Sequence, residues 1–211
     1  KQTLADAQKA KIKRILSALK TNPGDHILEI GCGWGGFAEF AAKEIGCRIT
    51  GLTISQEQFD YAKKRIFNAG LNEKVDIKLQ DYRDERGLYD RIASIEMFEA
   101  VGEAYWDSYF QKLRHCLKPG GKAVIQSITI DEQYFERYRS STDFIQQYIF
   151  PGGMLPSAER LIALASSHGL KLYNRLSFGS DYAWTLARWH ERSIEVDKQL
   201  RELGYDERFI R

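Results

Sequence analysis

The chain has 211 residues and a formal net charge of +2. This length suits a single domain over residues 1–211, and the small charge predicts no nucleic-acid partner. No stretch approaches the ~18 apolar residues of a membrane span, and no signal peptide heads the sequence. The three cysteines, Cys32, Cys47 and Cys116, lack metal-ligand spacing, which predicts a reducing, cytoplasmic location and no metal.

Strands and helices are predicted to alternate through the first 130 residues. The predicted helices are Thr3–Lys20 with a capping box from Thr3 to Asp6, Phe37–Glu44, one between Ser55 and Gly70, and Tyr105–Leu117. The predicted strands are His26–Ile30, Arg48–Thr53, Val75–Leu79, Asp90–Ile95 and Lys122–Ile130. This alternation predicts an α/β fold with a doubly wound, mostly parallel sheet.

The alternation breaks after Asp131. A helix over Glu132–Tyr148, an apolar loop over Ile149–Gly153, a helix from the Ser157 cap to near Gly169, a strand over Lys171–Phe178 and a helix over Trp184–Leu203 are predicted. Residues 131–156 form either a helical lid over the carboxyl ends of the strands or an extra helix packed on the core.

The segment LEIGCGWGG, Leu28–Gly36, predicts a strand end, a glycine turn and a helix start. Its glycines also fit a dinucleotide fingerprint, but a carboxylate at the turn, Glu29, suits a cationic ligand better than a pyrophosphate. S-adenosylmethionine carries a sulfonium and an ammonium and no phosphate. We therefore predict that Glu29, Gly31, Gly33 and Gly35 bind this cofactor, and that the chain is a methyltransferase.

The adenosine half of the cofactor needs further contacts. Thr53 and Gln58 follow the second predicted strand and are candidates to bind the ribose, although Gln58 also fits a capping box. Asp81 can accept a hydrogen bond from adenine, and Tyr82 can stack on its ring. The alternative for Asp81 and Tyr82 is an ordinary polar loop.

Two carboxylates, Glu96 and Glu99, follow the fourth predicted strand. Such acids can hold a cation, act as a base or orient one, and either can instead be a solvated loop charge. We assign Glu96 to the cofactor and Glu99 to catalysis. Gln126 and Ile128 lie on the same predicted rim, and Tyr182 could return a phenol to it.

Several segments together resemble the cyclopropane fatty acid synthases and their mycolic-acid relatives. They are LEIGCGWGG, GLTISQEQ, QDYRD, YDRIASIEMFEAVGE, LKPGG, the Ile149–Ser157 segment IFPGGMLPS, and FGSDYAWTLARWHER. The resemblance implies a Rossmann-like class I methyltransferase that moves a methyl group from S-adenosylmethionine to a cis double bond of a phospholipid acyl chain. A carbocation then loses a proton to bound bicarbonate and closes to a cyclopropane. The match places Glu99 on the bicarbonate-binding glutamate, Tyr182 on the family tyrosine and Ile128 on a backbone contact to the anion.

Three departures from the family pattern bear on this interpretation. Gln126 stands where the family commonly has a histidine, which keeps methyl-branching of acyl chains open. A Tyr-Ser-Cys stretch is expected before Lys1 and a last strand after Arg211, so the chain resembles a fragment whose longer parent could dimerise and touch the inner face of a membrane. N-methylation of a small amine, or a non-catalytic module that binds cofactor or lipid, are the remaining alternatives.

Overall fold

The computed structural model describes residues 3–210 of the chain. Residues 9–172 form one compact unit, and the described residues of 1–8 and 173–211 form another. The larger unit contains the sheet and the candidate site, and the smaller unit contains the helices near the C-terminus. The single-domain prediction stays a prediction. No helix within residues 3–210 is long and apolar enough to cross a membrane.

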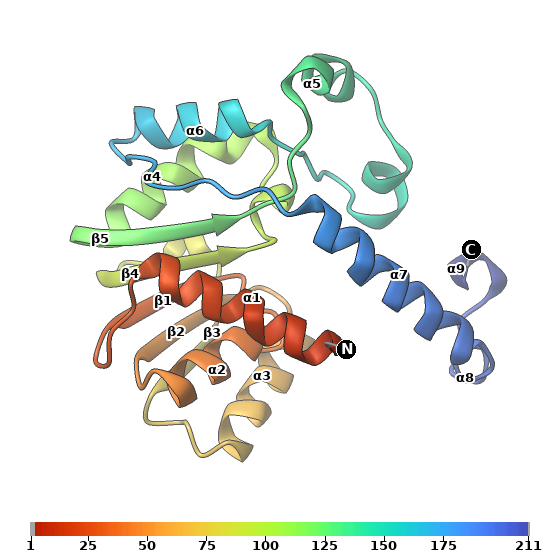
Figure 1. Cartoon of the computed structure of the whole chain (residues 1–211), viewed down its shortest axis with the longest axis horizontal. Coiled ribbons are helices and arrows are strands. Elements are labelled where there is room, and N and C mark those ends of the chain that lie inside the picture. The colour runs from red at the N-terminus through yellow and green to blue at the C-terminus, as the bar shows by residue number, and fades with distance from the viewer. Residues whose placement is uncertain (1–2, 211) are drawn as a thin grey trace. The chain divides into compact units, whose positions relative to one another are not determined.

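The sheet of the larger unit has five parallel strands in the order β3-β2-β1-β4-β5 (Figure 1). They are β1 (His26–Ile30), β2 (Arg48–Thr53), β3 (Val75–Leu79), β4 (Tyr89–Ile95) and β5 (Leu117–Gln126). The first three have the predicted bounds. The doubly wound α/β fold is therefore confirmed, and all five strands end at one edge of the sheet.

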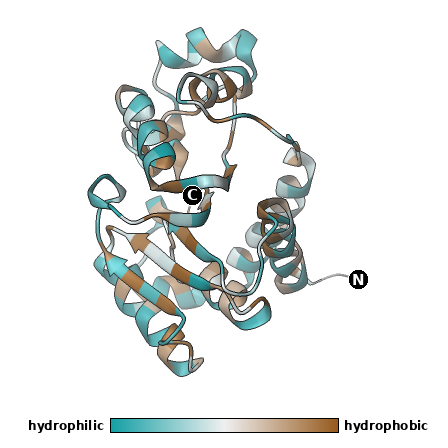
Figure 2. Ribbon diagram, turned by 90° about the vertical axis from the view of Figure 1, so that its left-hand side faces the viewer, coloured by the Kyte–Doolittle hydropathy of each residue, from teal (hydrophilic) through white to brown (hydrophobic). Residues whose placement is uncertain are grey.

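Each face of the sheet carries its own hydrophobic cluster. Because side chains alternate along a strand, Ile27 packs against α1 (Leu4–Leu19), α2 (Gly36–Glu44) and α3 (Gln56–Asn68), whereas Leu28 belongs to the cluster on the other face. That second face is covered by α4 (Trp106–Cys116) and α6 (Ala158–Ser167). Figure 2 shows hydrophobic residues gathered on the strands.

The predicted capping box of α1 is confirmed. The Thr3 hydroxyl accepts from the Asp6 N–H at 3.1 Å, and the Asp6 carboxylate accepts from the Thr3 N–H at 3.2 Å. Ser157 likewise caps α6 by accepting from the Arg160 N–H at 3.2 Å. Side-chain oxygens that accept from helix-terminal N–H groups fix where these helices begin.

The predicted bounds of the fifth strand were wrong. β5 begins at Leu117 and runs through Pro119–Gly121, where the register with β4 shifts between Tyr89 and Arg91. The strand therefore begins before the predicted Lys122, and a β-bulge accommodates the extra residues. The strand ends at Gln126, and Ile130 instead forms an isolated bridge with Ser157.

The helix predicted over Glu132–Tyr148 is interrupted. It divides into α5 (Glu132–Arg139) and a short π-helix, η4 (Ile145–Ile149). The hydroxyls of Ser140 and Ser141 both donate to the Arg137 carbonyl, at 3.1 and 2.9 Å. Such local bonds compete with continuation of a helix. Phe135 of α5 is fully buried against Trp106, and whether the segment also acts as a lid stays a prediction.

The strand predicted over Lys171–Phe178 was wrong. Residues 171–178 have no regular secondary structure, and residues 171–177 are exposed, so their apolar alternation buries nothing. The helix predicted over Trp184–Leu203 begins earlier, at Gly179, and divides into α7 (Gly179–Glu195) and α8 (Asp197–Glu202). A last short helix, α9, covers Glu207–Ile210.

A buried carboxylate, Glu85, closes the loop between β3 and β4. Its Oε1 accepts from the N–H groups of Arg86 (2.9 Å) and Gly87 (2.7 Å), and its Oε2 accepts from Lys78 (3.2 Å). Burial opposes ionisation of this carboxyl, but these donors prevail and lower its pKa to about 2. A carboxylate with a depressed pKa stabilises the fold above its unfolded-state pKa.

We expect Glu85→Gln to lower the free energy of unfolding by about 3 kcal/mol at pH 7, since the pKa shift corresponds to that amount. The difference from the unchanged protein should shrink as pH falls from 4.5 toward 2, where the native carboxylate is protonated. Urea unfolding at pH 7 and pH 3 measures this. An equal difference at both pH values would contradict the assignment.

Candidate active site

The glycine turn after β1 leaves backbone open to a ligand. Gly31, Gly33 and Gly35 have φ values of +80°, +53° and +77°, a region that favours glycine. A Cβ on Gly31 would lie 2.9 Å from Met97 Cγ, whereas a Cβ on Gly33 would meet no atom within 4 Å. The backbone at Gly33 therefore faces open space at the start of α2, as cofactor binding requires.

Glu29 lies directly before this turn and is 3% exposed. Its Oε2 has no hydrogen-bond partner among the described residues. Burial raises the pKa of this carboxyl well above its usual value. An unpartnered buried acceptor is costly, and a cationic donor would satisfy it. The ammonium group of S-adenosylmethionine fits this requirement.

Thr53 and Gln58 meet at the end of β2. The Thr53 hydroxyl donates to Gln58 Oε1 at 2.7 Å and accepts from the Ser55 N–H at 3.2 Å. Ser55 caps α3 as predicted, but the Gln58 side chain turns to Thr53 instead of closing a capping box. The structure thus brings together the two side chains predicted to bind ribose.

A hollow of about 260 Å³ lies beside the ends of β2 and β3. It is lined by Ile54, Gln56, Leu79, Gln80 and Asp81. Ile54 and Leu79 are 78% and 45% exposed, so two apolar side chains are available to a flat ring such as adenine. Asp81 lines the hollow, and its predicted contact with adenine stays a prediction.

The Asp81 carboxylate is already paired with Arg83. The guanidinium donates to both oxygens, at 3.0 and 2.6 Å, and these bonds lower the pKa of Asp81. A carboxylate has about four acceptor positions, so this pair orients Asp81 without saturating it.

Tyr82 packs its ring edge-on against Tyr109, with centroids 5.6 Å apart. It does not belong to the lining of the hollow. Stacking of Tyr82 on adenine therefore stays a prediction.

We expect Tyr82→Ala to weaken S-adenosylmethionine binding about two- to tenfold, because a stacked aromatic pair contributes about 0.5–1.5 kcal/mol. Titration calorimetry of the complete protein measures this. Tyr82→Phe is the matched control and should bind like the unchanged protein. Equal affinity of the alanine variant would rule out stacking.

At the ends of β4 and β5, Glu96 contacts Gln126. Gln126 Nε2 donates to Glu96 Oε1 at 2.5 Å, and the Glu96 N–H donates to the Gln126 carbonyl at 2.9 Å. Lys11 of α1 also donates to Glu96 Oε1, at 3.1 Å. The contact with Lys11 was missed, because no sequence spacing relates the first helix to this rim.

Glu99 lies nearby in η2 (Phe98–Ala100) and contacts Ile128. The Ile128 N–H donates to Glu99 Oε1, and Oε2 is buried without a partner among residues 3–210. Burial raises the pKa of Glu99, against the opposing effect of the Ile128 bond. The structure thus unites Glu99 with Ile128, and Gln126 with Glu96, and the predicted contact of Glu96 with the cofactor stays a prediction. Tyr182 belongs to the other unit, and its predicted role stays a prediction.

Within residues 3–210, no group of three or more histidine, cysteine or acidic side chains could hold a metal ion. Cys32 in the glycine turn is buried, and burial raises the pKa of its thiol to about 12. This thiol is therefore a small packing group and not a nucleophile.

Comparison with known proteins identifies the family of the chain. A family model described as mycolic acid cyclopropane synthetase matches residues 1–211. The chain is 42% identical over 209 residues to the tuberculostearic acid methyltransferase UfaA1 of Mycobacterium tuberculosis, covering 99% of this chain and 49% of that protein. It is 39% identical over 208 residues to the cyclopropane-fatty-acyl-phospholipid synthase of Escherichia coli K12, covering 99% and 52%.

The crystal structure of the mycolic acid cyclopropane synthase CmaA1, complexed with SAH and CTAB, superposes with a TM-score of 0.87 at 28% identity. The match covers 98% of this chain and 76% of that one. The chain spans about half the length of the two curated relatives. Since the family model matches it from end to end, the chain belongs to the mycolic acid cyclopropane synthetase family.

Proposed function

We propose that the protein containing this chain transfers a methyl group from S-adenosylmethionine to the cis double bond of an unsaturated phospholipid acyl chain. The observation that carries the proposal is Glu99, a half-buried carboxylate just after the carboxyl end of β4, whose Oε2 is shielded from water and has no partner among the described residues. An alkene is a weak nucleophile, so the reaction needs an activated methyl group, close alignment and exclusion of water. The buried Oε2 of Glu99 is shielded from water, which agrees with the last of these needs.

The cofactor residues are assigned from the fit described above. Glu29 would accept from the ammonium, Thr53 and Gln58 would bind the ribose hydroxyls, and the hollow at Asp81 would take the adenine. Bound S-adenosylmethionine supplies an electrophilic methyl group on its sulfonium. The relative CmaA1 is complexed with SAH, which supports this choice of cofactor.

The cationic acyl chain must then lose a proton. Glu99 provides the position, because Ile128 anchors its Oε1 and leaves Oε2 as an acceptor. That acceptor fits the hydroxyl of a bicarbonate ion, which would supply a base between Glu99 and the acyl chain. Glu99 orients the base and, as an anion with one oxygen shielded from water, stabilises the positive charge.

Cyclopropane closure is the product that we propose first, as in the family of the E. coli relative. Methyl-branching is the second candidate. Gln126 favours it, because an amide cannot titrate as a histidine does, and so does the name of the relative UfaA1, a tuberculostearic acid methyltransferase. Both candidates share the first transfer step and the loss of one proton.

Mass spectrometry of membrane lipids from cells with and without the complete protein tests the proposal. A gain of 14 mass units on monounsaturated chains, with loss of the double bond, would establish cyclopropane formation. The same gain with a double bond retained, or a gain of 16 after reduction, would establish methyl-branching. Unchanged lipids would refute the acyl substrate and turn the test to amines and then to a non-catalytic binding role.

An acyl-chain substrate also sets the partners that we propose. The protein would be cytoplasmic and would touch the inner face of the membrane peripherally to reach phospholipid chains. A homodimer of the complete protein is part of the same proposal. Sedimentation with and without anionic vesicles would test both, since binding moves the protein to the vesicle fraction and dimerisation doubles its mass.

A further inference from the structure

Glu96 is the first residue after β4 and has φ +52°, in the left-handed region that disfavours residues with a Cβ. Among residues 3–210 only Glu96 and Lys20 share this property without being glycine. Backbone strain of this kind persists where the surrounding contacts over-determine it, and it often marks functional sites. A glutamate in this strained conformation therefore indicates that the Glu96 side chain has a role.

Gln126 makes a double contact with Glu96. The backbone bond from the Glu96 N–H to the Gln126 carbonyl (2.9 Å) fixes the two strand ends, and the side-chain bond from Gln126 Nε2 to Glu96 Oε1 (2.5 Å) fixes the amide. Lys11 holds the same carboxylate oxygen from α1 at 3.1 Å. Glycine would suit the backbone better, but it would lose the side-chain bonds.

The chemistry of the pair assigns the orientation of the amide. A carboxylate only accepts hydrogen bonds, so Gln126 must turn its NH₂ group to Glu96 and its carbonyl oxygen away. Gln126 is 9% exposed, so water does not compete strongly for this side chain. Two residues further on, Ile128 anchors Glu99. The ends of β4 and β5 are thus tied together by two carboxylates, one of which orients an amide.

We infer that Glu96 is a positioning residue for the reaction. It holds the Gln126 amide so that a non-titrating carbonyl oxygen faces the cationic acyl chain and determines which C–H bond of that chain breaks. This inference rests on the proposed function and deepens it, because it names what selects the product.

The two outcomes balance in atoms and electrons. When a C–H bond of the transferred methyl group breaks, its electron pair forms the ring-closing C–C bond. When the C–H bond of the neighbouring methyl-bearing carbon breaks, its pair forms a C=C bond in a branched chain. In both outcomes one proton leaves to the base at Glu99, and nothing is oxidised or reduced.

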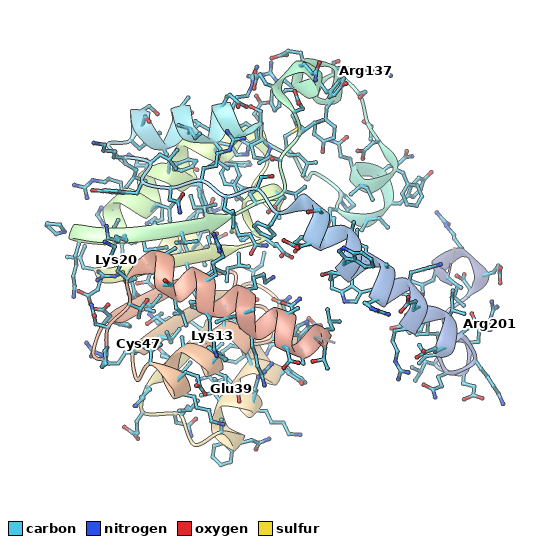
Figure 3. All side chains as sticks on the ribbon, in the orientation of Figure 1. Lys13, Lys20, Glu39, Cys47, Arg137 and Arg201 are labelled. Atoms are coloured by element: carbon cyan, nitrogen blue, oxygen red, sulfur yellow. The ribbon has the colours of Figure 1, made fainter. Side chains whose placement is uncertain are left out.

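Three variants of the complete protein distinguish the hydrogen bond that positions the Gln126 amide from the negative charge of Glu96 and from backbone strain. Glu96→Gly removes the carboxylate and suits the left-handed backbone, so it should fold. Glu96→Gln removes the charge but keeps a carbonyl that can accept from Gln126. Lys20→Gly makes the same backbone change at the end of α1, a position labelled in Figure 3, and leaves the rim untouched.

The products are measured as the ratio of cyclopropane to branched alkene after ozonolysis, which cleaves only the alkene. We expect Glu96→Gly to change this ratio at least fivefold, and Glu96→Gln and Lys20→Gly to stay within twofold of the unchanged protein. A ratio that Glu96→Gly leaves unchanged would overturn the positioning role. A change of equal size in Lys20→Gly would attribute the effect to the fold and also overturn it.

A second measurement needs no turnover. The side-chain amide of Gln126, assigned by its loss in Gln126→Leu, should shift in the ¹⁵N–¹H spectrum of Glu96→Gly and stay unchanged in Lys20→Gly. If the Gln126 amide signal were unchanged in Glu96→Gly, the contact between Glu96 and Gln126 would be refuted, even if lipids are methylated. If the unchanged protein formed no lipid product, the proposed function would be refuted. The spectrum would still show whether Glu96 holds the Gln126 amide.

Discussion

Replacing Glu99 with glutamine should lower kcat for methyl transfer about 100-fold or more and leave the Kd for S-adenosylmethionine within about threefold. Glutamine can still accept from the Ile128 N–H, so the local fold should survive. What is lost is the negative charge and the acceptor that orients the base, and groups that handle protons contribute about 10²–10⁴-fold to rate. Single-turnover kinetics and calorimetric titration measure the two quantities separately.

Glu103→Gln is the matched control, because Glu103 lies four residues along the same loop and pairs with Arg139 at 2.7 Å. It should leave kcat unchanged. If Glu99→Gln weakened cofactor binding but kept full turnover at saturation, Glu99 would belong to the cofactor site and the proposed role would fail.

The pH dependence of turnover gives an independent check on Glu99. Burial raises the pKa of its carboxyl, and the nearby Glu96 adds to the shift. Because the ionised form is the active one, kcat should fall as pH decreases, with a midpoint above the ordinary 4.5. The same acid limb should vanish in Glu99→Gln. A midpoint at or below 4.5 would show that Glu99 is not the group that titrates.

The sheet was predictable because its signals are local. β1 and β2 are short segments rich in apolar and β-branched residues, and β3 alternates apolar and charged residues. Ser55 and Ser157 mark the starts of the helices that they cap. The strand predicted over Lys171–Phe178 failed for the opposite reason. Its apolar residues have the right alternation, but no described strand pairs with them, and pairing is a tertiary property that a single segment does not carry.

The candidate site was predictable where strand ends fix position. Glu99 and Ile128 follow neighbouring parallel strands, so their meeting was implied by topology. Lys11 could not be found this way, because its approach to Glu96 depends on how α1 packs across the sheet. Pairing of Asp81 with Arg83 was equally hidden, since a two-residue separation favours a turn contact only after the loop has formed its short helix.

Replacing Glu29 with glutamine should weaken S-adenosylmethionine binding about 100-fold, because a charged hydrogen bond in a buried site contributes about 2–3 kcal/mol. Without a cofactor, burial raises the pKa of this carboxyl well above its usual value, so burial favours the protonated form. Binding of an ammonium should ionise it. Calorimetry in buffers of different ionisation enthalpy should therefore show proton release on binding, and the release should disappear in Glu29→Gln.

Without cofactor, Glu29 should make the stability of the fold depend on pH in the opposite direction to Glu85. An acid whose pKa is raised in the folded state binds a proton that the unfolded chain loses above 4.5, so stability decreases as pH rises toward the folded-state pKa. Glu29→Gln should remove that decrease, whereas Glu44→Gln, an exposed acid on α2, should not. Thermal unfolding at pH 5 and pH 8 measures this. Cofactor binding without proton release, together with a pH-independent difference in unfolding, would mean that Glu29 is ionised before the cofactor arrives and that some other group supplies its counter-charge.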